Sequence, residues 1–417
     1  MLFINKIILL LSLILLITNH SSNKVTATRQ IKQIETNKII TDTQPKAPVL
    51  LIPGFGGSKL EAKLTDFKSK HWYCHSNKDW FLLWVSLDMF VPVVADCSME
   101  YISLAWDGKS PQSQEGTEFR VVSGVDGVVY LDPTIHFENY YLNMVNELKK
   151  EGYQENLDLF AAPYDFRLSP KNLTLYFNQL KNLVEYSYKI DKKKVTLVCH
   201  SMGCKMTTFF LTQQTQEWKD TNIEQLIAIA PAIGGAFEGL RSVLFGNNFG
   251  DDLMTNKDFQ SLAISWPGIY FNIPYDTKLW TIPIAVSDNK KYYSTNQDYH
   301  QLFTDLGLPE KSHQILDYVW DDNQNIKNPN VKLRILYGYG SKTHYQVVFK
   351  DKTLNDSVEY VDTSGDGVLL EELVLNYCKG WTDNESASCQ GFKGVTHQDL
   401  VSNKDVISSV MDLIKEQ

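Results

Sequence analysis

Outside its N-terminal segment, the 417-residue sequence has no apolar run that approaches the roughly 20 residues a helix needs to cross a bilayer. The N-terminal segment is itself short. Lys6 precedes an apolar or small stretch, Ile7–Ile17, and small residues follow at Val25–Ala27. This order is typical of a signal peptide, and we predict one over residues 1–27. A short signal anchor is the alternative interpretation. The sequence thus favours a protein of the secretory pathway or the cell exterior.

The chain also lacks an excess of basic residues. Its 40 Lys and Arg are outnumbered by 49 Asp and Glu, which gives a net charge of −9. The basic residues are dispersed along the chain instead of gathering into one stretch. Because such a composition offers no positive surface to a phosphate backbone, we expect no nucleic-acid partner.

Cysteine is scarce, with only six residues in the chain. Cys74 and Cys97 flank an aromatic segment, and Cys378 and Cys389 lie close together, so each pair is expected to form a disulfide in an oxidising compartment. Cys199 and Cys204 lie in an apolar stretch, and we interpret them as buried free thiols.

Three sequons agree with passage through the secretory pathway. An Asn-X-Ser/Thr triplet accepts a glycan only in a lumenal compartment. The sequence therefore predicts glycosylation at Asn172, Asn355 and Asn384.

Short apolar runs that end at Gly, Pro or a polar residue alternate with helical patterns. A polar lead-in, residues 28–47, precedes them. Runs of this kind are typical of strands buried on both faces, and the alternation predicts a mostly parallel sheet covered by helices on both faces. The predicted strands are residues 48–52, 195–198, 226–230 and 333–337, and the clearest helical patterns are residues 140–150 and 173–186. We expect one domain over residues 48–417, with insertions at about 72–97 and 232–274.

The most informative segment is Val195–Cys204, in which an apolar run leads into His-Ser-Met-Gly. A serine on a sharp turn between a strand and a helix projects its hydroxyl above the sheet, and small residues are needed two positions before and after it. Gly203 meets this need, while Cys199 replaces the more usual glycine. The segment predicts that Ser201 is the nucleophile of an α/β-hydrolase.

The rest of a catalytic triad should follow in the order acid, then histidine. Asp366 lies in a Gly-Asp-Gly turn after a predicted strand, Val358–Val361, and His397 precedes a predicted final helix from about residue 401 to 414. We expect His397 to act as general base and Asp366 to orient its imidazole.

An oxyanion hole needs two backbone N–H groups aimed at the developing negative charge. Met202 follows the nucleophile, and Phe55 lies in the glycine-rich turn Pro53–Gly57, so these two are the predicted donors. A simple tight loop is the alternative for that turn. A phosphate cradle is disfavoured because no Gly-Lys-Ser/Thr sequence ends the turn.

A competing motif overlaps the predicted acid. Asp362-x-Ser364-x-Asp366-Gly367 resembles the start of a calcium loop, but position twelve is Leu373 where a bidentate Glu is required. We therefore predict no metal and no cofactor, with calcium ligation by Asp366 as the alternative.

Several long motifs together resemble one family. They are residues 53–64, 161–168, 200–204, 365–367 and 396–397. Through them the chain resembles the lecithin:cholesterol acyltransferase and lysosomal phospholipase A family from about Pro48 to the C-terminus. The resemblance implies an α/β-hydrolase core, the triad and oxyanion donors named above, and a lysosomal or extracellular location.

The resemblance also implies accessory features. These are a membrane-contacting loop bounded by the disulfide Cys74–Cys97, a mobile lid near residues 234–262 and a structural pair, Asp165 and Arg167. The chain departs from the family at Cys199, and at Ile335, where sterol-esterifying members carry a disulfide cysteine. The second departure leaves the acyl acceptor open.

The aromatic segment within residues 72–97 has two interpretations. Its side chains either contact a membrane beside the active site or pack beneath the insertion. The candidate membrane-binding residues are Trp72, Trp80, Phe81, Leu82 and Trp84.

The function implied is cleavage of a phospholipid acyl ester through a Ser201 acyl-enzyme, at a phospholipid membrane or lipoprotein-like surface. The acyl group would pass to water, as in a phospholipase A, or to a lipid alcohol such as a sterol, as in a dedicated O-acyltransferase. A catalytically silent lipid-binding protein is the alternative from another class.

Overall fold

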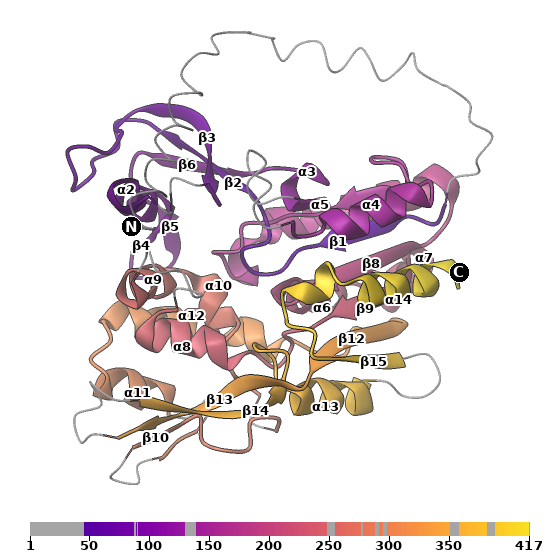
Figure 1. Cartoon of the computed structure of the whole chain (residues 1–417). Helices are drawn as coiled ribbons and strands as arrows, with labels where there is room; N and C mark the ends of the chain where they lie inside the picture. Colours follow the sequence, from indigo (N-terminus) through magenta and orange to yellow (C-terminus); the bar gives the residue numbers. More distant parts are fainter. Residues whose placement is uncertain are drawn as a thin grey trace, which may run out of the picture. The chain divides into compact units, whose positions relative to one another are not determined.

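The computed structural model describes residues 46–86, 89, 91–129, 139–247, 255–276, 278–287, 292–294, 298–350, 358–381 and 388–416 (Figure 1). The predicted signal peptide and the predicted sequons at Asn355 and Asn384 lie outside these ranges, as does nearly all of the lead-in.

A central parallel sheet has the strand order β15-β12-β9-β8-β1-β7. Every residue of β1 and β8 is buried, which explains why β1 is a continuous apolar run and why β8 is apolar except at Thr196 and His200. The strands are β1 Val49–Ile52, β7 Leu159–Ala161, β8 Val195–His200, β9 Ile223–Ile229, β12 Leu333–Tyr339 and β15 Ser388–Lys393. The predicted runs at residues 48–52, 195–198, 226–230 and 333–337 correspond to β1, β8, β9 and β12.

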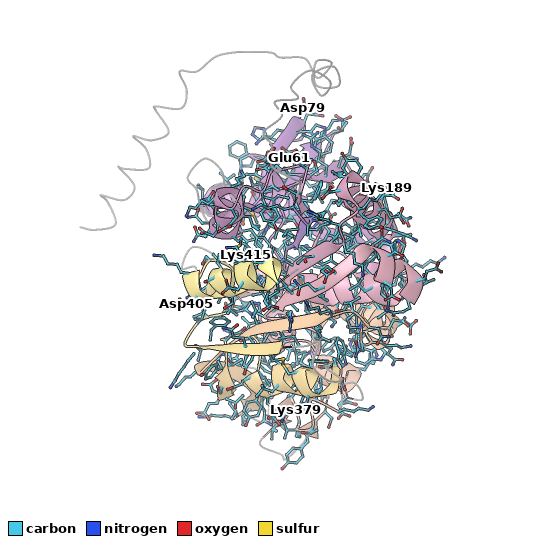
Figure 2. All side chains as sticks on the ribbon, turned by 90° about the vertical axis from the view of Figure 1, so that its right-hand side faces the viewer. Glu61, Asp79, Lys189, Lys379, Asp405 and Lys415 are labelled. Atoms are coloured by element: carbon cyan, nitrogen blue, oxygen red, sulfur yellow. A yellow bond between two sulfur atoms is a disulfide. The ribbon has the colours of Figure 1, made fainter. Side chains whose placement is uncertain are left out.

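Helices cover both faces of this sheet. Figures 1 and 2 place α14 and α13 on opposite sides of β12 and β15. The helices connected to the sheet strands are α4 Leu142–Lys150, α5 Thr174–Asp191, α6 Met202–Thr212, α7 Gln216–Asn222, α13 Glu371–Trp381 and α14 Lys404–Lys415. Asn403 caps the N-terminus of α14, because its side chain accepts hydrogen bonds from two backbone N–H groups of the first turn of that helix.

The first predicted insertion, residues 72–97, contains β3 and the first part of an adjoining helix. In an antiparallel sheet of strand order β3-β2-β6, the other two strands lie outside these residues. The disulfide Cys74–Cys97 joins the loop before β3 to this helix. The elements are β2 Leu60–Leu64, β3 Lys78–Trp84, α2 Pro92–Ile102, the hairpin β4 Leu104–Trp106 and β5 Pro111–Ser113, β6 Thr117–Val121 and α3 Asp126–Val129. We call residues 72–97 the aromatic segment.

The second predicted insertion, residues 232–274, is helical. It contains α8 Phe237–Phe245, α9 Asn256–Ala263 and α10 Pro267–Phe271. A further sheet of order β11-β10-β13-β14 follows, and the end of β14 delivers the chain to Asp366. The remaining elements are β10 Ala285–Ser287, β11 Tyr292–Tyr293, α11 Tyr299–Asp305, α12 Glu310–Gln324, β13 Ser341–Phe349, β14 Val358–Gly365 and the 3₁₀ turns Pro170–Asn172 and Asp399–Val401. Within the described ranges, no helix is long and apolar enough to cross a membrane.

Candidate active site

Ser201 lies on the sharp turn between β8 and α6. Its backbone has φ 53° and ψ −125°, a conformation that a non-glycine residue adopts at a cost of about 1–3 kcal/mol. The turn is held because the Ser201 N–H donates to the Ile229 carbonyl at 3.0 Å. A Cβ on Gly203 would lie 2.2 Å from the Pro53 carbonyl oxygen, so only glycine fits there. The surrounding main chain therefore fixes the position of the serine hydroxyl.

The two cysteines beside Ser201 form a disulfide, so the prediction of free thiols was wrong. The chain reverses from strand to helix between them, which brings the Cα atoms of Cys199 and Cys204 to 4.9 Å. Such a separation lies within the range that a disulfide spans. The sequence pattern did not reveal the pairing because the two cysteines lie five positions apart, and only the chain reversal makes them neighbours.

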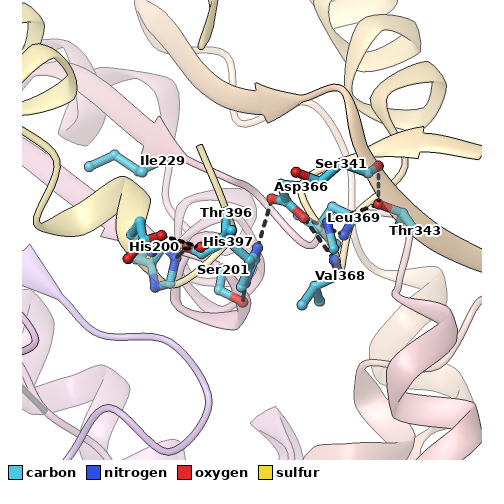
Figure 3. A network of polar contacts seen from close by, with 12 residues as sticks. His200, Ser201, Ile229, Ser341, Thr343, Asp366, Val368, Leu369, Thr396 and His397 are labelled. Carbon is cyan, nitrogen blue, oxygen red and sulfur yellow. Dashed lines mark hydrogen bonds and ion pairs between the residues drawn. The ribbon is translucent and has the colours of Figure 1, made fainter. Parts of the chain in front are cut away.

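His397 lies between Ser201 and Asp366 (Figure 3). The distance from His397 Nε2 to Ser201 Oγ is 2.8 Å, and that from His397 Nδ1 to Asp366 Oδ2 is also 2.8 Å. Because a carboxylate can only accept, Nδ1 carries the proton and Nε2 is free to take the serine proton. The arrangement is that of a nucleophile, a general base and an orienting acid.

The turn after β14 holds Asp366, which is 2% exposed. Its Oδ1 accepts hydrogen bonds from the N–H groups of Val368 at 2.9 Å and Leu369 at 2.7 Å, while Oδ2 accepts from His397. Both carboxylate oxygens are thus engaged by donors. In the described part of the chain, no group of three or more His, Cys, Asp or Glu is placed to hold a metal ion.

The two predicted oxyanion donors lie in segments that adjoin the serine, the first turn of α6 and the turn Pro53–Gly57. Met202 is the first residue of α6, where N–H groups have no intrahelical acceptor. Phe55 lies in a tight turn closed by a hydrogen bond of 3.1 Å from the Gly57 N–H to the Gly54 carbonyl. A Cβ on Gly54 would lie 2.9 Å from Ser201 Cβ, which shows how closely the turn approaches the nucleophile. Neither N–H donates to another described residue.

Two residues for which no role was predicted, Tyr140 and His200, contact this same turn. The His200 ring lies with its centroid 4.9 Å from that of His397, and Tyr140 packs against His200 at 5.6 Å. Burial, and then the neighbouring His397, lower the pKa of His200 well below its ordinary value, so that its ring is neutral. His200 could have been noticed as the neighbour of Ser201. Tyr140 gave no signal, because it belongs to no motif.

The candidate membrane-binding residues differ in their exposure to solvent. Trp72 is 94% exposed, whereas Trp80 and Phe81 are half-buried. The guanidinium of Arg120 lies 4.3 Å from the Trp80 ring centre, and the ammonium of Lys78 lies 3.9 Å from that of Phe81. Leu82 is half-buried in β3.

Trp84 lies at the turn Pro53–Gly57, which carries the predicted oxyanion donor Phe55 and is called the oxyanion turn below, instead of on the outer surface of the aromatic segment. Its Nε1 donates to the Gly56 carbonyl at 2.7 Å. Its ring packs against those of Phe166 at 5.1 Å and Trp266 at 6.0 Å. It therefore supports the turn that carries Phe55.

Three other predicted features lie away from the serine. Arg167, 1% exposed, donates to Asp165 and to the Ile102 carbonyl, which fits a structural pair. The Asn172 amide donates to the Tyr318 hydroxyl at 3.0 Å. A disulfide joins Cys378 to Cys389.

The fold and this site define the class of protein, a serine hydrolase of the α/β-hydrolase fold. A solved structure described as the Tle4–Tli4 complex has the same fold, with a TM-score of 0.56 and 12% identity over 89% of this chain and 99% of that one.

Sequence comparison narrows the class. The profile described as lecithin:cholesterol acyltransferase matches residues 80–310. The lysosomal phospholipase A and acyltransferase of Bos taurus is 30% identical over 87% of this chain and 90% of its own length. The phosphatidylcholine-sterol acyltransferase of Gallus gallus is 29% identical over 86% and 88%. The chain belongs to the lecithin:cholesterol acyltransferase family.

Proposed function

We propose that this protein cleaves a fatty acyl ester of a phospholipid and passes the acyl group to water or to an alcohol. The observation that carries the proposal is the continuous hydrogen-bonded chain from Ser201 through His397 to Asp366, with 2.8 Å at each link. The bovine relative, whose name includes both phospholipase A and acyltransferase, supports the same chemistry.

The reaction proceeds in two halves. Ser201 Oγ attacks the ester carbonyl while His397 Nε2 takes its proton, and the oxyanion is stabilised by the N–H groups of Phe55 and Met202. The carbon–oxygen bond to the lysophospholipid then breaks, and the leaving oxygen receives the proton from His397. Water or an alcohol next attacks the acyl-enzyme by the same steps, which releases a fatty acid or a new ester and restores Ser201.

The lipid reaches the site from a phospholipid membrane or a lipoprotein-like surface that the aromatic segment contacts. Support comes from Trp72, whose exposed ring lies edge-on to that of Tyr73 at 5.8 Å, in the loop that the Cys74–Cys97 disulfide anchors. An exposed indole on a loop that a disulfide anchors is suited to the boundary between water and lipid.

The compartment we propose is the secretory pathway, with the lysosomal lumen or the cell exterior as the site of action. The three disulfides support it, because disulfides form and persist in oxidising compartments.

Product analysis tests the proposal. The purified protein is incubated with phospholipid vesicles that contain a sterol and a long-chain alcohol, beside a Ser201→Ala control. Lysophospholipid with free fatty acid, from the unsubstituted protein alone, would identify a phospholipase A, and new esters would identify transfer to an alcohol. No turnover between about pH 4.5 and pH 7.5, together with no labelling of Ser201 by a fluorophosphonate, would contradict the enzymatic function and leave lipid binding.

A further inference from the structure

Three parts of the site come from separate stretches of the chain: the oxyanion turn, the end of β8 and the loop of His397. We propose that Tyr140 and His200 are positioning residues that couple the oxyanion turn to the catalytic histidine through one hydrogen-bonded relay. The inference rests on the proposed function.

The relay has a single consistent pattern of donors and acceptors. His200 Nε2 lies 3.1 Å from the His397 carbonyl oxygen, and because a carbonyl only accepts, Nε2 carries the proton. His200 Nδ1, 2.6 Å from the Tyr140 hydroxyl, is then the acceptor, and Tyr140 donates to it. The Gly54 N–H in turn donates to the Tyr140 oxygen at 2.8 Å. Every polar group of the relay is therefore satisfied.

Burial keeps both side chains in the protonation states that this pattern needs. Desolvation raises the pKa of the Tyr140 hydroxyl, so that it keeps the proton it donates. The neutral ring of His200 also avoids placing a second positive charge beside His397 when that residue holds the serine proton.

At one end, the relay shapes the oxyanion turn. A Cβ on Gly54 would lie 3.2 Å from His200 Nδ1, and a Cβ on Gly57 would lie 2.7 Å from Tyr140 Cε1. The side chains of His200 and Tyr140 therefore pack against the turn and leave no space for a side chain at Gly54 or Gly57. Since Gly54 immediately precedes Phe55, its hydrogen bond to Tyr140 helps to fix the orientation of the Phe55 N–H.

At the other end, the relay fixes the main chain of His397. The His397 N–H donates to the Asp366 carbonyl at 2.9 Å, and its carbonyl accepts from His200. Figure 3 shows His200 beside His397, on the side away from Asp366. Both backbone polar groups of the general base are therefore held, so its imidazole stays in line between Ser201 and Asp366.

The neighbouring tyrosine provides a matched control. Tyr141 is also buried, and its hydroxyl donates to the Ile52 carbonyl at 3.1 Å, outside the relay. Tyr140→Phe and Tyr141→Phe each remove one buried hydroxyl. We expect Tyr140→Phe to lower kcat on phospholipid vesicles, and the rate of fluorophosphonate labelling, by about 10- to 100-fold with KM unchanged, because misplacement of reacting groups by about 1 Å costs that much. The kcat and the labelling rate of Tyr141→Phe should stay within about twofold of those of the unsubstituted protein, although both variants lower the melting temperature.

Variants at His200 sharpen the test. His200→Gln keeps a donor for the His397 carbonyl and an acceptor for Tyr140, whereas His200→Leu keeps neither. The glutamine variant should retain a labelling rate at least about tenfold above that of the leucine variant.

The inference is overturned if Tyr140→Phe is labelled at the rate of the unsubstituted protein, or if Tyr141→Phe loses as much labelling rate as Tyr140→Phe does. It is also overturned if His200→Gln and His200→Leu are labelled at the same rate. If the unsubstituted protein is not labelled at all, the proposed function fails and the inference fails with it. The two failures are therefore distinguishable.

Discussion

The turn that carries Ser201 and the aromatic segment at residues 72–97 border the same site but are held in different ways. Main-chain contacts hold the turn: a Cβ on Gly203 would lie 2.2 Å from the Pro53 carbonyl oxygen, just after the first strand, and both flanking cysteines are fully buried. Side-chain rings hold the aromatic segment, whose tryptophans range from half-buried to 94% exposed.

The difference indicates how each region responds to change. A turn fixed by backbone packing has no freedom to relax, so substitutions there should act on the chemical step. In the aromatic segment, some side chains pack against other rings, as Trp84 does, whereas others, such as Trp72, are exposed to solvent. Substitutions there should act on stability or on lipid binding, according to which kind is changed.

The largest effect is expected at the acid that orients His397. Asp366→Asn should lower kcat by about 10⁴-fold with little change in the melting temperature, because an amide can stabilise the wrong imidazole tautomer. Asp362→Asn is the matched control, since its carboxylate bonds to His344 outside the triad. Turnover of phospholipid vesicles measures both.

Equal losses in the two variants would contradict this account of the triad. Activity that requires added calcium and disappears with a chelator would favour the calcium alternative for Asp366.

The three residues of the proposed triad could be chosen from the sequence because their signals are local. Ser201 lies at a strand-to-helix junction that requires small neighbours, and Asp366 lies in a Gly-Asp-Gly turn after a strand. The buried strands β1 and β8 were equally clear, since β1 is wholly apolar and β8 is mostly apolar.

Other features depend on contacts between distant residues. The hydrogen bond between Gly54 and Tyr140 joins residues 86 positions apart, and no sequence motif predicts it. Trp84 and Trp72 belong to the same aromatic segment, and the sequence does not distinguish them. In the structure, Trp84 packs at the oxyanion turn, whereas Trp72 is exposed. Strand β15, Ser388–Lys393, contains a glycine and polar residues and was not expected as a strand of the central sheet. Tertiary packing decides such cases, and local pattern does not.

Removing the disulfide from each region compares their contributions to folding. Cys74→Ser/Cys97→Ser opens a link across 23 residues and should lower the free energy of unfolding by about 3 kcal/mol. Cys199→Ala/Cys204→Ala opens a link across 5 residues and should lower it by about 2 kcal/mol while also slowing the labelling of Ser201. Urea unfolding measures both. A slower labelling rate in the first variant, and not in the second, would reverse the comparison.

Acid should weaken the fold through His200. The ring stays neutral in the folded protein, whereas in the unfolded chain it binds a proton below its ordinary pKa of 6.5. Because the unfolded state then binds more protons, the free energy of unfolding falls as the pH drops below 6.5, by about 1.4 kcal/mol per pH unit. His200→Gln should remove this contribution between about pH 6.5 and pH 5.5. An unaltered slope in His200→Gln would refute the prediction.

The smallest effect is expected at the exposed end of the aromatic segment. Trp72→Ala should weaken binding to phospholipid vesicles about tenfold, since burial of one such side chain in lipid contributes about 1.5 kcal/mol. Its turnover of a water-soluble ester should not change. Trp84→Ala should lower turnover of phospholipid vesicles and of the water-soluble ester, and it should destabilise the fold by about 3 kcal/mol. Flotation with vesicles and urea unfolding separate the two, and identical behaviour of the variants would show that the segment is not divided in this way.

The central claim, an acyl-enzyme at Ser201, is tested most directly by trapping it. The protein is mixed with a phospholipid that carries an isotope-labelled acyl chain, quenched in acid within milliseconds and digested, and the labelled peptide is sequenced by mass spectrometry. The account predicts one labelled peptide, with the acyl group on Ser201 and with loss of the label when water or an alcohol is given time to react. A labelled residue other than Ser201, or product release with no labelled peptide at any quench time, would contradict it.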